Sequence, residues 1–333
     1  MPSPRISVLL PCFNAGAWVD EAVASVFAQT FQDFEILIVD DGSTDPATLE
    51  KLKNYRDPRI AVLRTINRGL PAARNHAARS ASGELFCALD ADDRLAPTWF
   101  EKGVALLVQR PDLAFVSHWL EAFGDEQWTW KPERCDLPAL LATNTVNGAA
   151  LVRREPFETI GGYDESMRDG CEDWDFWLRL VERGFEGAII PEVLFHYRRR
   201  RESMSRMMHK DAVYPKPLDT IVMRHEVFYR RHVIDLLVAK EQELVQLRQE
   251  VSKLQRDRLS FLEPSLARAR EELAAVHAKV ERARPVVAAE QDEQQLTARV
   301  AELEREVSAL RASWSWWITG PARRVYSWLT GRP

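Results

Sequence analysis

The part of the chain before about residue 235 alternates short apolar runs with segments whose apolar residues recur at helical spacing. Apolar runs bounded by turn residues predict strands, and they read RISVLLP, FEILIVDD, RIAVLRT and ELFCALD. Residues 17–29 and 70–81 predict helices. Strands that alternate with helices indicate a mostly parallel α/β sheet with helices on both faces. Such sheets bind ligands outside the carboxyl ends of their strands.

The pattern changes near residue 235, where glycine almost disappears and heptad spacing begins. Heptads with charged flanks predict a long α-helical coiled coil over 235–313, which Pro264 and Pro285 break into segments or kink. Because the apolar seam is narrow, a homo-oligomer is favoured over a helix that folds back on the globular part. The predicted core positions are Leu237, Lys240, Leu244, Leu247, Val251, Leu254, Arg258 and Phe261, then Leu266, Ala269, Leu273, Val276, Val280 and Ala283, then Val300, Leu303, Val307, Leu310, Trp314 and Trp317.

The last 22 residues, ASWSWWITGPARRVYSWLTGRP, combine four tryptophans with arginines and contain no acidic residue. Aromatic residues beside arginines suit a membrane interface. The alternative is the end of a helix that packs on its own partner. No run of 18 apolar residues predicts a membrane-spanning helix.

Charge and composition exclude several classes of partner and site. The net charge is −5 and the pI is near 5.9, so nucleic acid is not an expected partner. The start of the chain lacks the pattern of a signal peptide. The four cysteines are far apart and form no C-x-x-C pair, which predicts reduced thiols rather than a zinc site. We therefore expect a cytoplasmic protein, with contact to the inner face of the cell membrane through the tail.

Acidic residues follow two of the predicted strands. Asp40 and Asp41 end one strand, Asp90, Asp92 and Asp93 end another, and Asn14 follows a third. The ends of parallel strands share one edge of the sheet, so these side chains should lie close together. Clustered carboxylates suit a hard divalent cation such as Mg²⁺ or Mn²⁺. The alternative is a solvated turn that caps a helix opening at Pro97.

Several ordered blocks resemble the family 2 glycosyltransferases, which have the GT-A fold. The blocks read SVLLPCFNAGAWVDEAVASVFAQTFQDFEILIVDDGSTD, NRGLPAARNHAARSASGELFCALDADDRL, GAALVRREPFETIGGYDES, EDWDFWLRL and HYRRRRESMS, and they cover about 60% of the chain. The resemblance implies a Rossmann-like sheet. It also implies inverting transfer of a hexose from a nucleotide-diphosphate sugar to a saccharide or lipid-linked saccharide. Cell-surface polysaccharide or glycolipid assembly is the expected setting.

The resemblance also assigns candidate residues. It places the nucleotide at Pro11, Phe13, Asn14, Asp41, Arg74 and Asp90, where Phe13 replaces a residue that is often tyrosine. For Arg74 the alternative is a surface helix arginine. It places a divalent cation at Asp92, Asp93 and His196, although family members differ in which acid touches the metal and which holds the ribose. For His196 a structural role is the alternative.

The resemblance makes Asp173 the general base and Glu172 its neighbour. A carboxylate within hydrogen-bond reach of the acceptor hydroxyl can take its proton. The pair would lie in the first turn of a helix, where the dipole favours ionised carboxylates, and helix capping is the alternative role. We expect Trp119, Trp128 and Trp130 to pack in the core, although they could stack on sugars. The arginines of HYRRRRESMS either bind the diphosphate or form a solvated charge run.

The expected organisation is a glycosyltransferase domain over 1–215, a helical connector over 216–234, the coiled coil over 235–313 and the tail over 314–333. Two other function classes remain. A coiled-coil scaffold with an inactive, nucleotide-binding domain is one, and the intact Asp90, Asp92 and Asp173 argue against it. A nucleotidyltransferase is the other, but PCFNAGAW lacks the glycine-rich phosphate loop it would favour.

Overall fold

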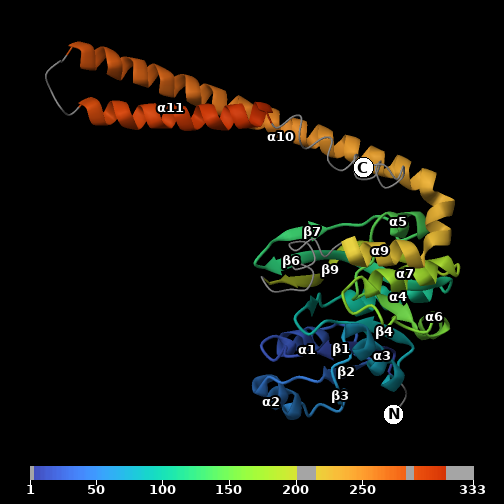
Figure 1. The fold of residues 1–333 in the computed structure, drawn as a ribbon. Coiled ribbons are helices and arrows are strands. Elements are labelled where there is room, and N and C mark those ends of the chain that lie inside the picture. The colour runs from blue at the N-terminus through green and yellow to red at the C-terminus, as the bar shows by residue number, and fades with distance from the viewer. Residues whose placement is uncertain (1–3, 201–214, 283–288, 313–333) are drawn as a thin grey trace. The chain divides into compact units, whose positions relative to one another are not determined.

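A computed structural model describes residues 4–200, 215–282 and 289–312 (Figure 1). Its first compact unit, Met1–Leu236, is built on one sheet. The strand order among the described residues is β3-β2-β1-β4-β8-β6-β9-β5, with β7 paired to β6. The strands are β1 (Ile6–Cys12), β2 (Phe34–Asp41), β3 (Ile60–Thr65), β4 (Leu85–Ala88), β5 (Arg94–Leu95), β6 (Leu113–Gly124), β7 (Trp128–Trp130), β8 (Leu151–Arg153) and β9 (Glu186–Arg199).

The first four long strands are parallel, as the sequence predicts. Strand β1 pairs in parallel with β2 and β4, and β2 pairs in parallel with β3. The register sets Cys12 beside Asp40 and Leu9 beside Ala88. The carboxyl ends of β1, β2 and β4 therefore share one edge, as expected. Beyond β4 the sheet is mixed, because β8 runs antiparallel to β4 and β6 while β6 and β9 are parallel.

Helices cover both faces of the sheet, because side chains alternate between the faces of a strand. Ile6 and Val8 of β1 join a core with residues of α1 and α4. Leu9, the next residue after Val8, points to the other face and joins a second core with residues of α3 and α7. The helices of this unit are α1 (Val19–Phe27), α2 (Pro46–Asn54), α3 (Leu70–Ser80), α4 (Trp99–Gln109), α5 (Leu137–Ala142), α6 (Arg154–Thr159), α7 (Glu172–Glu182) and α9 (Pro215–Arg224), and α10 begins in it.

Aspartates begin two of these helices. Asp45 accepts hydrogen bonds from the backbone amides of Ala47 and Thr48, and Pro46 opens α2. Asp136 accepts a hydrogen bond from the amide of Ala139 at the start of α5. An aspartate at the N-cap satisfies amides that have no partner inside the helix, and a proline in the first turn loses no helical hydrogen bond. These local signals fix where α2 and α5 begin.

The second unit, Leu237–Pro333, contains most of α10 (Glu226–Arg282) and all of α11 (Ala289–Ala312). The two helices run side by side (Figure 1), and Leu262, Leu266 and Ala269 of α10 bury themselves with Leu303 of α11. Arg270 also pairs with Glu304 across the hairpin. The second and third heptad runs thus pack against each other within one chain.

The expected break at Pro264 is wrong, because α10 continues through it. A proline removes one backbone hydrogen bond, and the residues on both sides of it pack against α11. The first heptad run stays exposed, with Leu247, Val251 and Leu254 each about half exposed or more. An oligomer formed through these positions stays a prediction, which a light-scattering mass of a monomer would contradict. Pro285 and the tryptophan-rich tail lie outside the described residues.

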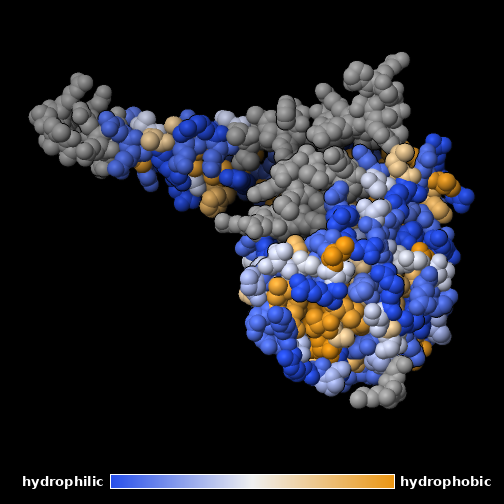
Figure 2. All heavy atoms as spheres, turned by 60° about the horizontal axis from the view of Figure 1, so that its bottom comes forward, coloured by the Kyte–Doolittle hydropathy of each residue, from blue (hydrophilic) through white to orange (hydrophobic). Residues whose placement is uncertain are grey.

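Two further expectations concern membrane-spanning helices and the cysteines. No helix among the described residues is long and apolar enough to cross a bilayer. All four cysteines are free, as expected. Figure 2 shows hydrophobic side chains exposed on the face of the molecule turned forward. Large apolar side chains exposed in the first unit include Phe13, Val62 and Ile66.

Candidate active site

One cavity of about 510 Å³ in the first unit brings the two predicted acidic groups together. Asp90, Asp92 and Asp93, which follow β4, line it, and so do Glu172 and Asp173 at the start of α7. It lies where ligands bind open α/β sheets, beyond the carboxyl end of a central parallel strand. The structure therefore joins two sequence motifs that lie far apart along the chain.

Arg74 of α3 connects the two acidic groups. Its Nη1 donates to Oε1 of Glu172 at 2.6 Å and its Nη2 donates to Oδ1 of Asp90 at 2.8 Å. The side chain is almost fully buried, so the alternative of a surface helix arginine is wrong. Burial alone would lower the pKa of Arg74, but the two carboxylates raise it. Arg74 is therefore charged and holds both carboxylates in place.

The three aspartates after β4 have different surroundings. The Asp92 carboxylate pairs with Arg200, whereas Oδ1 of the buried Asp93 accepts a 2.7 Å hydrogen bond from the backbone amide of Arg198. Burial and the neighbouring Asp90 charge raise the pKa of Asp92. Burial also raises the pKa of Asp93. The helix-capping alternative is wrong, because β5 follows the turn and α4 begins only at Trp99.

Asp90 and Asp92 both line the cavity, and carboxylate oxygens are the type of ligand that a hard divalent cation takes. Burial and mutual repulsion disfavour the ionised form of Asp92, and a bound cation would reverse both effects. Among residues 4–200, 215–282 and 289–312, no three His, Cys, Asp or Glu side chains are grouped to hold a metal. Asp90 and Asp92 would therefore supply two ligands, and Mg²⁺ sites commonly take their remaining oxygens from substrate phosphates and water.

His196 is not among the residues that line the cavity. It lies on β9 opposite Arg94 of β5 and Glu121 of β6. Burial lowers the pKa of His196, Glu121 raises it and Arg94 lowers it further. His196 lies two residues from Arg198, whose backbone amide binds Asp93, and its role as a metal ligand stays a prediction.

The start of α7 presents Glu172 and Asp173 differently. Glu172 is buried against Arg74, while the half-buried Asp173 accepts a 3.2 Å hydrogen bond at Oδ2 from the side-chain amide of Asn144. Cys171, just before the helix, has a φ of 60°, a left-handed conformation that is uncommon outside glycine. Burial raises the pKa of both carboxyl groups, although the Arg74 charge opposes it. Both residues line the cavity, and within residues 4–200, 215–282 and 289–312 only Glu172 of the two forms an ion pair.

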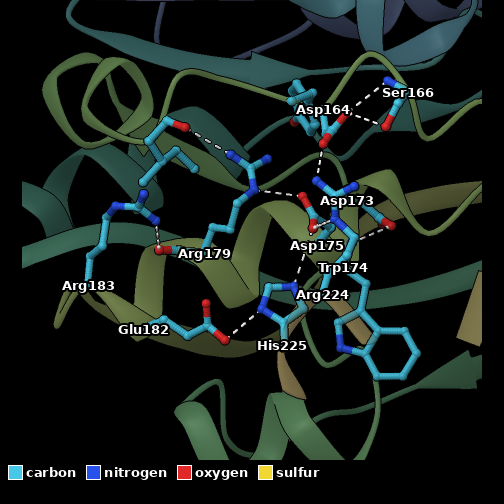
Figure 3. A network of polar contacts seen from close by, with 12 residues as sticks. Asp164, Ser166, Asp173, Trp174, Asp175, Arg179, Glu182, Arg183, Arg224 and His225 are labelled. Atoms are coloured by element: carbon cyan, nitrogen blue, oxygen red, sulfur yellow. Dashed lines mark hydrogen bonds and ion pairs between the residues drawn. The ribbon is translucent and has the colours of Figure 1, made fainter. Parts of the chain in front are cut away.

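A buried polar cluster anchors α7 behind this pair (Figure 3). Asp175, with no exposed surface, accepts a 2.6 Å hydrogen bond from Arg179, and Arg224 and His225 lie 3.1 and 3.3 Å from its other oxygen. His225 also lies 2.6 Å from Glu182. Burial alone would raise the pKa of Asp175, but the hydrogen bond from His225 and the arginine charges lower it to about 2. The cluster ties the helix that carries Asp173 to Arg224, the last residue of α9, and to His225, which lies between α9 and α10.

We expect His225 to make the stability of the protein depend on pH. Burial alone would lower its pKa, but Asp175 and Glu182 raise it above the usual value. Its stabilising contribution is then fully present below the unfolded pKa of about 6.5 and is lost as the pH rises through the folded pKa. Urea unfolding of wild type and His225→Gln at several pH values measures this. The variant should show a shallower fall of the unfolding free energy with rising pH.

His76→Gln, which changes a histidine outside the cluster, is the control and should keep the wild-type pH dependence. Equal pH dependence in wild type and His225→Gln would contradict the assignment.

The residues predicted to hold the base lie beside the cavity rather than in it. Pro11, Phe13, Asn14 and Asp41 are not among its lining residues. Phe13 is 51% exposed, so its ring is accessible. Asn14 and Asp41 support loops: Oδ1 of Asn14 accepts from the amides of Thr44 and Asp45, and Asp41 accepts from those of Arg68 and Gly69. Their placement at the ends of β1 and β2 is as expected, and the contacts to a base remain predictions.

Aromatic side chains line the wall built by β6, β7 and β9. The expected core packing is wrong for Trp128, which is 42% exposed and lines the cavity. Trp130 is partly buried against the core, as expected, and it also lines the cavity. Among the described strands β7 pairs only with β6, so it stands at the rim of the sheet and not in a core layer. Trp119 differs, because it donates its indole N–H to the carbonyl of Pro132 and does not line the cavity.

Comparisons with known proteins agree with this site. A model of the glycosyl transferase family 2 matches residues 7–163. TuaG of Bacillus subtilis, a glycosyltransferase whose name assigns it to teichuronic acid biosynthesis, is 31% identical over 216 residues, which are 63% of this chain and 84% of TuaG. The chain belongs to glycosyltransferase family 2. Another relative of this glycosyltransferase is EpsE of the same organism, which is 29% identical over 213 residues, 61% of this chain and 76% of EpsE.

The fold of this family 2 glycosyltransferase also matches a solved structure. S. aureus TarS, residues 1–349 in complex with UDP-GlcNAc, superposes with a TM-score of 0.54 at 19% identity. The match covers 72% of this chain and 78% of that one. At this identity the likeness shows the fold alone, and the expected GT-A fold is confirmed.

Sequence reasoning missed two features of the glycosyltransferase site. Asn144 is in no recognised block, and only the fold brings it to Asp173. Arg200 was one of several arginines in a charge run, and the structure selects it by its pairing with Asp92. A polar residue between α5 and β8 carries no sequence signal for such a role.

Proposed function

We propose that the protein transfers a hexose from a nucleoside-diphosphate sugar to an acceptor hydroxyl, with inversion at the anomeric carbon. The observation that carries the proposal is that Arg74 links Asp90 to Glu172 inside one cavity that Asp173 also lines. A single ligand in that cavity can thus meet both the acidic turn after β4 and the candidate base on α7. Inversion needs a base on one side of the reacting carbon and the leaving group on the other.

The diphosphate would lie at the turn after β4. Arg198 and Arg200 line the cavity beside Asp92, and arginine binds phosphate through directed N–H groups. A divalent cation held by Asp90 and Asp92 would stabilise negative charge on the departing diphosphate. The nucleobase would lie toward the exposed ring of Phe13, beyond the end of β1.

Asp173 would take the proton of the attacking hydroxyl. Asn144 holds one of its oxygens in position, and the start of α7 places it on the cavity wall. Glu172 would act through Arg74, since it is buried against that side chain. Of these two acidic residues, Glu172 positions Arg74, and only Asp173 contacts the substrate.

The names of the relatives indicate the biosynthetic process in which we expect the sugar transfer to take place. TuaG is named for teichuronic acid biosynthesis and RfbC of Myxococcus xanthus for O-antigen biosynthesis. We propose that this chain likewise adds a sugar to a cell-surface polysaccharide or glycolipid at the inner face of the membrane. UDP is the first nucleotide to test, because the similar TarS structure was solved with UDP-GlcNAc. The remaining alternative is a scaffold whose domain binds a nucleotide without turnover.

Isothermal titration of the full chain with UDP, dTDP and GDP tests the donor site. We expect one nucleotide to bind in the presence of Mn²⁺ and to bind at least about tenfold more weakly without it, a difference of about 1.4 kcal/mol. Asp92→Ala should bind with the weaker affinity whether or not Mn²⁺ is present. Asp112→Ala, which removes an exposed aspartate paired with Arg110 outside the cavity, is the matched control.

Failure of folded wild-type protein to bind any of the three nucleotides would sink the proposal. Equal nucleotide binding with and without Mn²⁺ would show that a divalent cation has no part in the proposed donor site.

A further inference from the structure

Two neighbouring rungs of the sheet place five large side chains on one wall of the cavity. In the first rung Trp128 of β7 and Tyr197 of β9 are both paired with Ala122 of β6. In the second rung Trp130 and Phe195 are both paired with Leu120. Residues two apart on a strand share a face, and all five large side chains line the cavity. We call Trp128, Trp130, Leu120, Phe195 and Tyr197 the aromatic wall.

The small residue between two rings makes this wall continuous. Ala122 is fully buried although it has only a methyl group. The rings of Trp128 and Tyr197 come within 6.4 Å of each other, centroid to centroid, at an interplanar angle of 57°. The two rings therefore lean together over Ala122 and present one aromatic surface to the cavity.

The outer part of this wall is open, while Leu120 and Phe195 beneath it are buried in the core. Trp128 is 42% exposed, and an exposed aromatic patch at a cavity usually marks a binding site. The side chain contributes less to the core than a buried indole would, so burial within the fold does not account for it. A ligand that covers the Trp128 side chain would account for its exposure.

The other lining groups define what that ligand is. Asp173 and the amide of Asn144, joined by a 3.2 Å hydrogen bond, line the same cavity and offer polar contacts. A pyranose ring matches both surfaces, because its faces carry C–H groups and its rim carries hydroxyls. An alkyl chain would leave the polar groups unpaired. A nucleobase belongs beyond the acidic turn, where the diphosphate leads to Phe13.

We propose that the aromatic wall binds a sugar ring of the acceptor and turns one of its hydroxyls toward Asp173. The inference rests on the proposed function and adds to it the residues that hold and select the acceptor. The acceptor is a saccharide end, recognised through its C–H face by Trp128 and Tyr197. A lipid that carries the saccharide would extend away from this wall.

The test observes the tryptophan side chains of the aromatic wall directly, and it needs neither a sugar donor nor catalytic turnover. Full-length protein labelled with 5-fluorotryptophan is studied by ¹⁹F NMR, with Trp128, Trp130 and Trp119 assigned from single Trp→Phe variants. Methyl β-glucopyranoside, methyl β-galactopyranoside and N-acetylglucosamine are added to about 50 mM, since single sugars bind in the millimolar range. Hexanol at the same concentration is the alkyl probe.

We expect at least one saccharide to shift the Trp128 and Trp130 signals in a saturable way and to leave the Trp119 signal in place. In Trp128→Ala the saccharide-induced shift of Trp130 should fall at least threefold, with unchanged thermal unfolding as the folding control. No shift of Trp128 with any saccharide, or a shift with hexanol alone, would overturn the proposal. Failure of nucleotide binding in the calorimetric titration would instead contradict the proposed function, so the two failures are distinguishable.

Discussion

Replacing Asp173 by asparagine is expected to lower the rate of sugar transfer by about 10²- to 10⁴-fold, the usual contribution of a general base. Asparagine keeps the size of the side chain and an oxygen that can accept from Asn144, but it cannot take a proton. The loss should therefore appear in kcat, with nucleotide affinity within about twofold of wild type. Steady-state release of nucleoside diphosphate, combined with calorimetric nucleotide binding, separates the two effects.

The control for this experiment lies in the same segment. Asp169 is exposed, lies four positions before Asp173 and is not among the cavity residues. Asp169→Asn should retain wild-type turnover. Full turnover by Asp173→Asn would remove Asp173 from the chemistry and shift the role of base to another group.

Replacing Arg74 by methionine is expected to cost about 3–5 kcal/mol of the unfolding free energy, the range seen when one partner of a buried ion pair is removed. Glu172, which is 6% exposed, would lose its 2.6 Å partner and would have to carry an unpaired buried charge or take up a proton, and both cost stability. Arg74→Lys should recover little of the loss, because a single ammonium group cannot reproduce the fork that reaches Glu172 and Asp90 together. Urea denaturation of the full chain measures the loss.

Two further variants sharpen this test. Arg79→Met removes an exposed arginine of the same helix that lies 3.6 Å from Glu165, and it should cost less than about 1 kcal/mol. The double variant Arg74→Met with Glu172→Gln should recover part of the loss, because the buried charge is then gone. An Arg74→Met protein as stable as Arg79→Met would show that the buried pairing stabilises nothing.

The spacing of apolar residues and the turn residues correctly predicted the first four long strands and helix α3. The apolar runs that became β1, β2, β3 and β4 end in turn residues, and their parallel pairing places Asp41 and Asp90 at one edge, as expected. The helix over residues 70–81 appears as α3. In these segments the spacing of apolar residues and the tertiary packing agree.

Other features depend on contacts between distant residues, and the sequence did not reveal them. Arg74 and Glu172 are 98 positions apart, and nothing in the helical pattern around Arg74 predicts its burial. Trp128 is a large apolar side chain, so core packing was the natural expectation. It fails because β7 is a short strand at the rim of the sheet. Pro264 is a strong local signal for a break, and the packing of its neighbours against α11 overrides it.

The stereochemistry of the first sugar released from a nucleotide donor shows whether Asp173 assists an inverting attack. With UDP-glucose, Mn²⁺ and no acceptor, water can take the place of the acceptor hydroxyl, and ¹H NMR follows the anomeric proton before mutarotation equalises the anomers. Attack assisted by Asp173 opposite the departing diphosphate predicts β-glucose first from this α-linked donor. UDP-galactose and UDP-N-acetylglucosamine, also α-linked, are measured in the same way. Release of the α-anomer first, or no turnover of any donor that the protein binds, would contradict the account.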